Sequence, residues 1–219
     1  MRASKTTAIF EQIKKDINNG SYSINEKLVE ADLAAQYETS RNTIRSVLSL
    51  LEKDNLVTIE PHKGAKVVSL SLKDIINFMD LRAEVEAYIF RIVTPILTDE
   101  DVAKMTAIYQ SMEATSEDID YENYSKLNHE FHEVIYSNCD NTPATDLVRD
   151  LISKVSKYYS KTILMPGRFE ATQAEHKNIL AAVKAKDGLL AADRVRDHIH
   201  GVRETLIEHY GYLNQTNKD

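Results

Sequence analysis

The sequence predicts a mainly α-helical protein with one small β-hairpin near its N-terminal end. Two observations carry this prediction. Between residues 6 and 70, stretches with helical apolar spacing are followed by two short runs rich in β-branched residues. From Leu72 onward every apolar stretch follows a helical period, and the breaks fall at Pro95, Pro143, Pro166-Gly167 and Asp187-Gly188.

Three short helices are predicted before the hairpin. The first covers residues 6–19, where Ile9, Ile13 and Ile17 recur at helical spacing. The second covers residues 30–37, which are strong helix formers. Ser40 is placed to cap the third helix, because its hydroxyl can accept from an unpaired N–H of the first turn. The apolar residues of this third helix recur at i, i+3, i+4 and i+7 and predict a buried stripe of Ile44, Val47, Leu48 and Leu51.

The hairpin is predicted from residues 56–59 and 65–68, which flank the turn formers Pro61 and Gly64. A helix, two helices joined by a tight turn, and then a hairpin is the order of a winged helix-turn-helix. Residues 1–70 are therefore expected to form a winged helix-turn-helix DNA-binding domain.

The rest of the chain is expected to form a C-terminal antiparallel all-α bundle, residues 71–219, after a linker at Ser69-Leu70-Ser71. Six helices are predicted, over about residues 72–97, 99–114, 121–138, 144–163, 169–186 and 188–212. Short connections between successive helices make neighbours antiparallel.

Composition restricts the class of protein. No apolar stretch approaches the roughly 18 residues of a membrane span, and the single Cys139 cannot form an internal disulfide. We expect a cytoplasmic protein with no membrane partner.

The net charge of −7 disfavours binding to nucleic acid, but the charge is unevenly distributed. Residues 1–70 carry 10 Lys/Arg against 9 Asp/Glu, which leaves 17 against 25 for the remainder. The first domain can therefore present a locally basic face.

The predicted third helix and the hairpin tip carry the candidate DNA contacts. Arginine pairs bidentately with guanine from a helix in the major groove, and hydroxyl and amide side chains bond phosphates or bases. The expected contacts are Ser40, Arg41, Asn42, Thr43 and Arg45 on the helix and His62, Lys63 and Gly64 on the wing. The alternatives are a solvated basic helix face and a hairpin tip that contacts nothing.

Three histidines on three predicted helices suggest a metal site. His132 shares a face with Asn128, which lies four residues earlier, while His176 and His198 fall on apolar stripes. Imidazole nitrogen suits a divalent transition metal such as zinc, nickel, iron or manganese. The expected ligands are Asn128, His132, His176 and His198. The alternative is three independently hydrogen-bonded core histidines.

These residues together resemble the GntR family of bacterial regulators, in the FadR-type subfamily with an FCD helical effector domain. In the first domain the resemblance rests on residues 40–45, SRNTIR, and 51–57, LEKDNLV. In the second it rests on Leu81-Arg82 with Glu86, on residues 128–132, NHEFH, on Glu175-His176 and on His198-Ile199, at spacing 132–176–198. Three positions depart from the family: Ile24-Asn25 replaces Pro-Gly, Glu38 replaces Gly, and Asn128 replaces an aspartate ligand.

The resemblance implies a homodimer that binds a short palindromic operator in double-stranded DNA, expected to be a repressor, and that responds to a small organic acid. With Asn128 in place of an aspartate, the site lacks one negative charge. An anionic effector would supply that charge. Arg82 is the expected effector-binding residue. The alternative for Arg82 is a salt bridge with Glu86, one turn away.

Two other functions stay open at this stage. Three histidines leave open coordination positions, as in a metal-dependent enzyme of an all-helical fold. Against this alternative, the sequence contains no H-E-x-x-H or E-x-x-H motif, and no catalytic residue is expected. The second alternative is a regulator that holds neither metal nor ligand.

Overall fold

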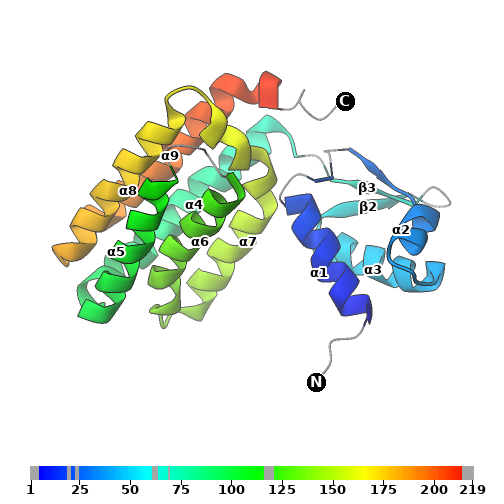
Figure 1. The fold of residues 1–219 in the computed structure, drawn as a ribbon, viewed down its shortest axis with the longest axis horizontal. Helices are drawn as coiled ribbons and strands as arrows, with labels where there is room; N and C mark the ends of the chain where they lie inside the picture. Colours follow the sequence, from blue (N-terminus) through cyan, green and yellow to red (C-terminus); the bar gives the residue numbers. More distant parts are fainter. Residues whose placement is uncertain are drawn as a thin grey trace. The chain divides into compact units, whose positions relative to one another are not determined.

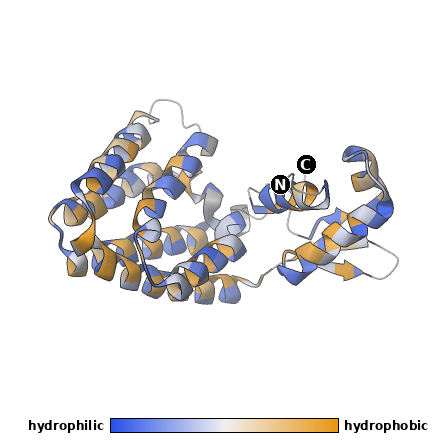
Figure 2. Ribbon diagram, turned by 90° about the horizontal axis from the view of Figure 1, so that it is seen from below, coloured by the Kyte–Doolittle hydropathy of each residue, from blue (hydrophilic) through white to orange (hydrophobic). Residues whose placement is uncertain are grey.

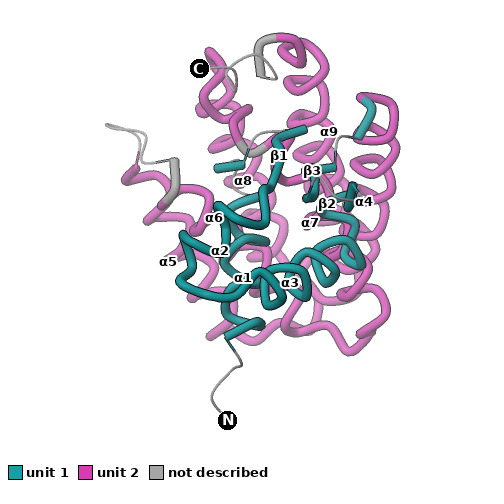
Figure 3. The backbone as a smooth tube through the Cα atoms, turned by 90° about the vertical axis from the view of Figure 1, so that its right-hand side faces the viewer, with its two compact units in different colours: residues 1–71, 214–219 teal, residues 72–213 magenta. Residues whose placement is uncertain are grey.

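A computed structural model describes residues 5–18, 21–22, 25–60, 64–68, 70–115 and 121–213. The chain divides into two compact units, one of residues 72–213 and one of residues 1–71 together with 214–219 (Figure 3). Each unit is built around its own elements, labelled in Figure 1.

The described residues of the first unit form the helices α1 (Lys5–Asn18), α2 (Glu30–Gln36) and α3 (Arg41–Lys53). The apolar stripes of α1 and α3 face each other, so that Ile13, Ile17 and Ile44 are fully buried. Ser40 caps α3 as predicted, because its side chain accepts from the backbone N–H of Thr43 at 3.1 Å. The cap fixes where the third helix begins.

The sheet has one more strand than the predicted hairpin. The strands β1 (Lys27–Leu28), β2 (Val57–Glu60) and β3 (Gly64–Val67) are antiparallel and lie in the order β1-β3-β2. Gly64 has φ +91°, and a Cβ there would lie 2.5 Å from the Leu28 carbonyl oxygen. Only glycine therefore lets β1 approach β3 this closely.

Two turns of this unit keep a left-handed backbone at positions where the sequence departs from the family's glycines. Asn25 has φ 67° and Glu38 has φ 47°. Asparagine tolerates this region, whereas a glutamate there is strained. Both positions therefore carry a residue less suited to this backbone region than glycine.

The second unit is an all-helical bundle (Figure 1). Its helices are α4 (Leu72–Val93), α5 (Asp99–Ala114), α6 (Tyr121–Ser137), α7 (Thr142–Tyr159), α8 (Arg168–Lys184) and α9 (Gly188–Leu213), with 3-10 turns η1 (Thr94–Ile96) and η2 (Ser160–Leu164). The long helix α4 packs against α9 and α7, α8 packs on α9, and α5 packs on α6.

Hydrophobic and hydrophilic residues alternate around these helices (Figure 2). The buried stripe of α4 includes Ile75, Met79 and Phe90, all at 0% exposure. Each predicted helix is present within a few residues of its expected bounds. The largest differences are at the ends of α4 and α7, which stop four residues before their expected ends, where the 3-10 turns η1 and η2 follow. The helix α7 also begins before Pro143, because proline is tolerated in the first turn of a helix.

The mainly α-helical fold with one small sheet is therefore confirmed. None of the described helices combines the length and the apolar character needed to cross a membrane.

Candidate DNA-binding face and candidate metal centre

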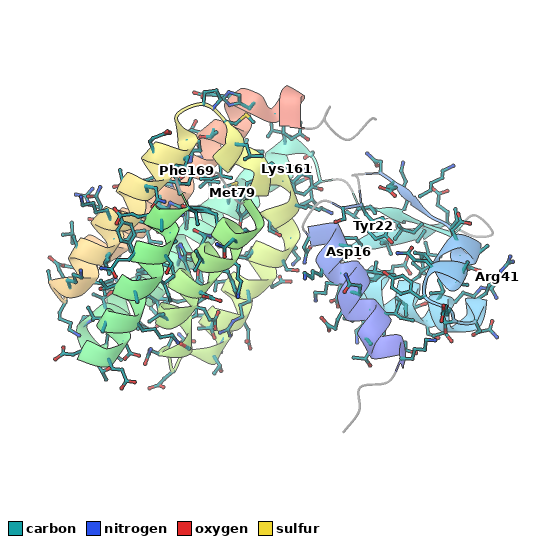
Figure 4. The ribbon with its side chains drawn as sticks, in the orientation of Figure 1. Asp16, Tyr22, Arg41, Met79, Lys161 and Phe169 are labelled. Atoms are coloured by element: carbon teal, nitrogen blue, oxygen red, sulfur yellow. The ribbon has the colours of Figure 1, made fainter. Side chains whose placement is uncertain are left out.

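The start of α3 presents polar side chains to solvent. Arg41, the first residue of the helix, and Asn42 are exposed, and Arg41 projects outward in Figure 4. Thr43 is half-buried, and its hydroxyl lies 2.9 Å from that of Ser40. The structure thus brings four of the predicted contacts together on the first turn of one helix.

Arg45 lies one turn further and is held by α2. Its Nε donates to both carboxylate oxygens of Glu30 at 2.9 Å, while 61% of the arginine side chain stays exposed. This ion pair raises the pKa of Arg45 through the hydrogen bond to Glu30. The pair joins the two helices of the helix-turn-helix, a contact that sequence spacing within one helix cannot reveal.

Of the predicted wing residues, His62 and Lys63 lie outside the described part of the chain. Gly64 begins β3 and serves the close approach to β1 described above.

The three histidines meet inside the helical unit. His132 on α6, His176 on α8 and His198 on α9 are 3%, 0% and 4% exposed. One ring nitrogen from each lies within 4.8 Å of the others. The ring centroids of His176 and His198 are 4.5 Å apart, and that of His132 is 5.6 Å and 5.5 Å from them. The sequence predicted this convergence from the apolar faces of three helices and from the family's spacing.

Two of the three imidazoles have a hydrogen-bond partner at Nδ1. His176 Nδ1 is 2.8 Å from the Thr172 carbonyl oxygen, and His198 Nδ1 is 2.8 Å from Glu175 Oε2. His132 Nδ1 lies 3.2 Å from Glu86 Oε2, within the distance of an ion pair but outside hydrogen-bond geometry. An acceptor at Nδ1 favours the tautomer whose Nε2 carries a lone pair. This is how proteins orient imidazoles for coordination.

Burial keeps two of these rings neutral. Desolvation, followed by the other histidines of the set, holds the pKa of His176 well below its usual value. Desolvation and His132 act in the same direction on the pKa of His198. The Nε2 atoms of His132 and His176 are buried without a hydrogen-bond partner in the described protein. A buried imidazole nitrogen of this kind needs a ligand, a water or a metal.

Arg82 lies next to this set and forms the ion pair that the sequence left open. Its Nε donates to Glu86 Oε1 at 2.5 Å and its Nη1 to the Tyr159 hydroxyl at 2.7 Å. The pair is buried, with Arg82 5% and Glu86 0% exposed. Burial alone would raise the pKa of Glu86, but Arg82 and His132 together lower it, so the carboxylate is ionised. Tyr159, 77 residues away in sequence, was not predicted.

A second ion pair, which is partly buried, supports His198. Arg168 donates from Nη1 and Nη2 to the two oxygens of Glu175 at 2.8 and 2.6 Å. A Cβ on Gly201 would lie 2.6 Å from Glu175 Oε1 and 2.8 Å from Arg168 Nη1, so this glycine leaves room for the pair. Sequence reasoning did not assign Arg168. The spacing of seven residues to Glu175 on one helix was the available signal.

Asn128 is half-buried on α6, one turn before His132. Its placement on the same helix agrees with the predicted shared face. An amide oxygen is a neutral donor, so this position contributes no charge to the site.

A helix-turn-helix with a wing sheet, joined to a separate helical domain, defines a class of DNA-binding transcriptional regulators. The chain belongs to the GntR family of such regulators. Residues 5–67 match the family described as bacterial regulatory proteins, gntR family, and residues 77–201 match the FCD domain.

Curated relatives and solved structures of the same kind match over nearly the whole chain. An uncharacterized HTH-type transcriptional regulator, YdhC, of Bacillus subtilis is 28% identical over 87% of this chain and 86% of its own length. The HTH-type transcriptional repressor GlaR of Escherichia coli is 26% identical over 87% and 90%. The structure of E. coli McbR/YncC aligns with a TM-score of 0.76 at 19% identity, covering 98% and 99% of the two chains, and thus shares the fold.

Proposed function

We propose that this protein is a homodimeric transcriptional repressor whose affinity for a palindromic operator is controlled by a small carboxylate bound at a metal-containing pocket. The observation that carries the proposal is the buried set of His132, His176 and His198, whose ring nitrogens lie within 4.8 Å of one another. Because this site lies in the same chain as a helix-turn-helix, binding of a metabolite there can change the affinity for DNA.

The first turn of α3 supports the DNA-binding part. Arg41 is exposed at the helix N-terminus, where side chains reach base edges in the major groove. Arg45 is oriented by Glu30, and only its Nε takes part in that pair. Its terminal nitrogens are therefore placed for a base or a phosphate. Lys63 is assigned to the wing by sequence alone. Repression is proposed because relatives such as GlaR carry the name of repressor.

The donor set fits a divalent metal such as zinc, nickel, iron or manganese. All three imidazoles are buried, and the Nδ1 atoms of His176 and His198 have hydrogen-bond partners. Three nitrogen ligands and an open position suit such an ion. His132, His176 and His198 would hold it, with Asn128 as a fourth ligand. The ion, when bound, supplies a Lewis-acidic centre for an effector carboxylate.

Charge explains why the effector should be an acid. Arg82 is balanced by Glu86 and Arg168 by Glu175, so the two ion pairs leave the surroundings of the histidines close to neutral. A divalent ion on neutral ligands then brings two uncompensated positive charges into a buried site, which is unfavourable without an anion. Arg82 has five N–H donors, of which two have the partners named above. It is the proposed second contact for the carboxylate.

Homodimerisation should not depend on the metal. The histidines are buried inside one unit, whereas a subunit interface needs an outer face. Leu81 and Tyr88, seven residues apart on α4, are large side chains that are 47% and 37% exposed. We therefore expect sedimentation to show the same dimer with and without a chelator. A monomer after chelation would remove this part of the proposal.

Calorimetric titration with zinc tests the metal site. The parent should bind one ion per chain. His132→Ala should weaken binding at least about tenfold, since loss of even a supporting contact costs about 10–100-fold. His129→Ala is the matched control, because His129 is exposed on the same helix and should leave zinc affinity unchanged. Equal affinities for the three proteins would reject the site.

Asn128→Asp tests the charge argument. A carboxylate ligand should strengthen zinc binding and weaken its dependence on an added organic acid, because the variant supplies the negative charge itself. Should the parent bind zinc at nanomolar affinity without any acid, and Asn128→Asp make no difference, the idea of compensating charge fails while the regulator assignment stands.

A further inference from the structure

Two lysines of α1 bind the two ends of the segment that carries α3. Helix α1 packs against α3 (Figure 1). Lys5 Nζ, at the start of α1, donates to the carbonyl oxygen of Glu38 at 2.7 Å. Lys14 Nζ donates to Asp54 Oδ2 at 2.8 Å and lies 5.4 Å from the centre of the Phe10 ring. Helix α1 is therefore joined to the chain just before and just after the third helix.

Lys5 lies at the C-terminal end of α2, in the turn that leads into α3. The Glu38 N–H donates to the Ala35 carbonyl at 3.2 Å and the Thr39 N–H to the Ala34 carbonyl at 2.9 Å. This pattern ends a helix on a left-handed residue, and Glu38 is that residue, with φ 47°. The last carbonyls of a helix carry the negative end of its dipole, where a cation is favourable. The Lys5 ammonium thus stabilises the turn from which α3 begins.

Lys14 lies at the C-terminal end of α3. Asp54 is the C-cap residue there, and the left-handed Asn55 that follows, with φ 56°, donates to the Glu52 carbonyl at 2.9 Å. A carboxylate beside the negative end of a helix dipole is unfavourable by itself. Lys14 supplies its counter-charge, and the two side chains are 31% and 38% exposed.

Glu38 and Asp54 are thus both poorly suited to their local backbone, and both are bound by lysines of α1. Such local conflicts are expected where function imposes a further requirement. The first turn of α3 carries the candidate DNA contacts, and functional side chains must be held within about 0.5 Å of their productive positions. A helix that is held at both ends resists sliding and rotation relative to α1.

We propose that Lys5 and Lys14 are positioning residues of the recognition helix, which act on operator recognition by holding α3 and not by contacting DNA. This inference rests on the DNA-binding part of the proposed function and is independent of the metal and the effector. Positioning residues contribute to the selectivity for the operator over other duplexes. Lysines that bind phosphate contribute instead to the affinity for every duplex and to its salt dependence.

Anisotropy titrations of the full-length protein test this role. They compare an operator, selected from random duplexes with the parent protein, with an unrelated duplex at several salt concentrations. The variants are Lys5→Met, Lys14→Met and Asp54→Asn. The matched control is Lys15→Met, because Lys15 carries the same charge at an exposed position next to Lys14.

Lys5→Met and Lys14→Met should each lower the ratio of operator affinity to unrelated-duplex affinity roughly twofold to fivefold, the range for one exposed ion pair. Their effect on the unrelated duplex and on the salt dependence should equal that of Lys15→Met, which leaves the ratio unchanged. Lys5→Arg and Lys14→Arg should retain the ratio of the parent, because a guanidinium can donate to the same oxygens.

Asp54→Asn separates positioning from charge. Removal of a negative charge by itself strengthens binding to every duplex and leaves the ratio unchanged. Positioning predicts instead that Asp54→Asn lowers the ratio as Lys14→Met does. The double variant should lower the ratio no further, because either substitution already removes the pair.

Two failures are distinguishable. If the parent selects no operator, the DNA-binding function fails and the positioning role with it. If the parent selects an operator but the lysine variants keep its ratio of affinities, the positioning role alone is overturned. Equal losses on both duplexes with a flatter salt dependence than that of Lys15→Met would identify the two lysines as phosphate contacts instead.

Discussion

Two arginine–glutamate ion pairs, one from each unit of this protein, differ in their exposure. The Arg45 side chain is 61% exposed and shares its Nε with Glu30. The side chains of Arg82 and Glu86 are only 6% and 0% exposed, and they contact Tyr159 and His132. The exposed pair orients a cation that solvent can reach, and the buried pair lies beside the three histidines. Under the proposed function, the same kind of ion pair would serve DNA recognition in one unit and effector binding in the other.

Removing Glu86 should have the largest effect on stability. Glu86→Ala leaves Arg82 buried without its counter-charge, which typically costs about 3–5 kcal/mol. Glu30→Ala is the matched control in the exposed pair and should cost less than about 1 kcal/mol. Urea denaturation of the metal-free protein measures both. Similar losses for the two variants would show that the difference in exposure has no energetic consequence.

The basic side chains of the predicted DNA contacts should determine the affinity for DNA. Arg41→Ala should weaken operator binding by about 1–3 kcal/mol and leave binding to unrelated duplexes nearly unchanged, because it removes a base contact. Lys63→Ala should weaken binding to all sequences and flatten the salt dependence, because it removes a phosphate contact. Fluorescence anisotropy on both kinds of duplex separates the two. If both variants bind the operator like the parent, the recognition helix is wrongly assigned.

The free energy of unfolding should decrease as the pH is lowered, because of the buried histidines. The pKa of His176 and that of His198 lie well below 6.5 in the folded state. The unfolded chain alone takes up these protons, so this stability is present above about pH 6.5 and is lost below it, at up to about 1.4 kcal/mol per pH unit for each ring. Glu175 acts in the opposite direction, because burial raises its pKa and the folded state binds that proton first. Glu175 alone therefore reduces the slope of stability against pH that the two histidines produce, but does not reverse it.

Denaturation of the metal-free protein between pH 7.5 and 5.5 measures this slope. His176→Gln should make it shallower, while His129→Gln, at an exposed position of α6, should not. A slope that is the same in all three proteins would mean that the buried rings are protonated in the folded state.

The smallest effect is expected at a turn of the DNA-binding unit. Glu38 has φ 47°, a conformation that favours glycine. Glu38→Gly should raise the free energy of unfolding by up to about 1 kcal/mol, since relief of the left-handed backbone outweighs the flexibility that glycine adds. Glu38→Ala removes the charge but keeps the strain. An equal gain from the alanine variant would assign the effect to charge.

Helical spacing was sufficient to predict the parts of the fold and the site that lie on one helix. The Ser40 cap, the apolar face on which each histidine lies and the alternative pairing of Arg82 with Glu86 all follow from residues three or four apart on regular helices. The resemblance to the family added the spacing 132–176–198, which indicated that the three histidines belong to one site. These features depend on local geometry and on the burial of apolar stripes.

Contacts between helices could not be predicted in this way. Arg45 reaches Glu30 across the helix-turn-helix, and Arg82 reaches Tyr159, because helix packing places them together. The strand β1 has two residues, too few for an alternating pattern. The support of His198 by Glu175, 23 residues earlier, likewise depends on how α8 packs on α9.

The most direct test of the account is the operator affinity of the zinc-loaded protein with and without a small organic acid that calorimetry shows to bind it. Anisotropy with a labelled operator duplex should show a five- to 150-fold change in affinity, the range of about 1–3 kcal/mol in which such couplings fall. The acid must bind one arrangement of the DNA-binding units better than another for this to happen. An unchanged operator affinity at a concentration of acid that calorimetry shows to be saturating would contradict the proposal that the buried site controls DNA binding.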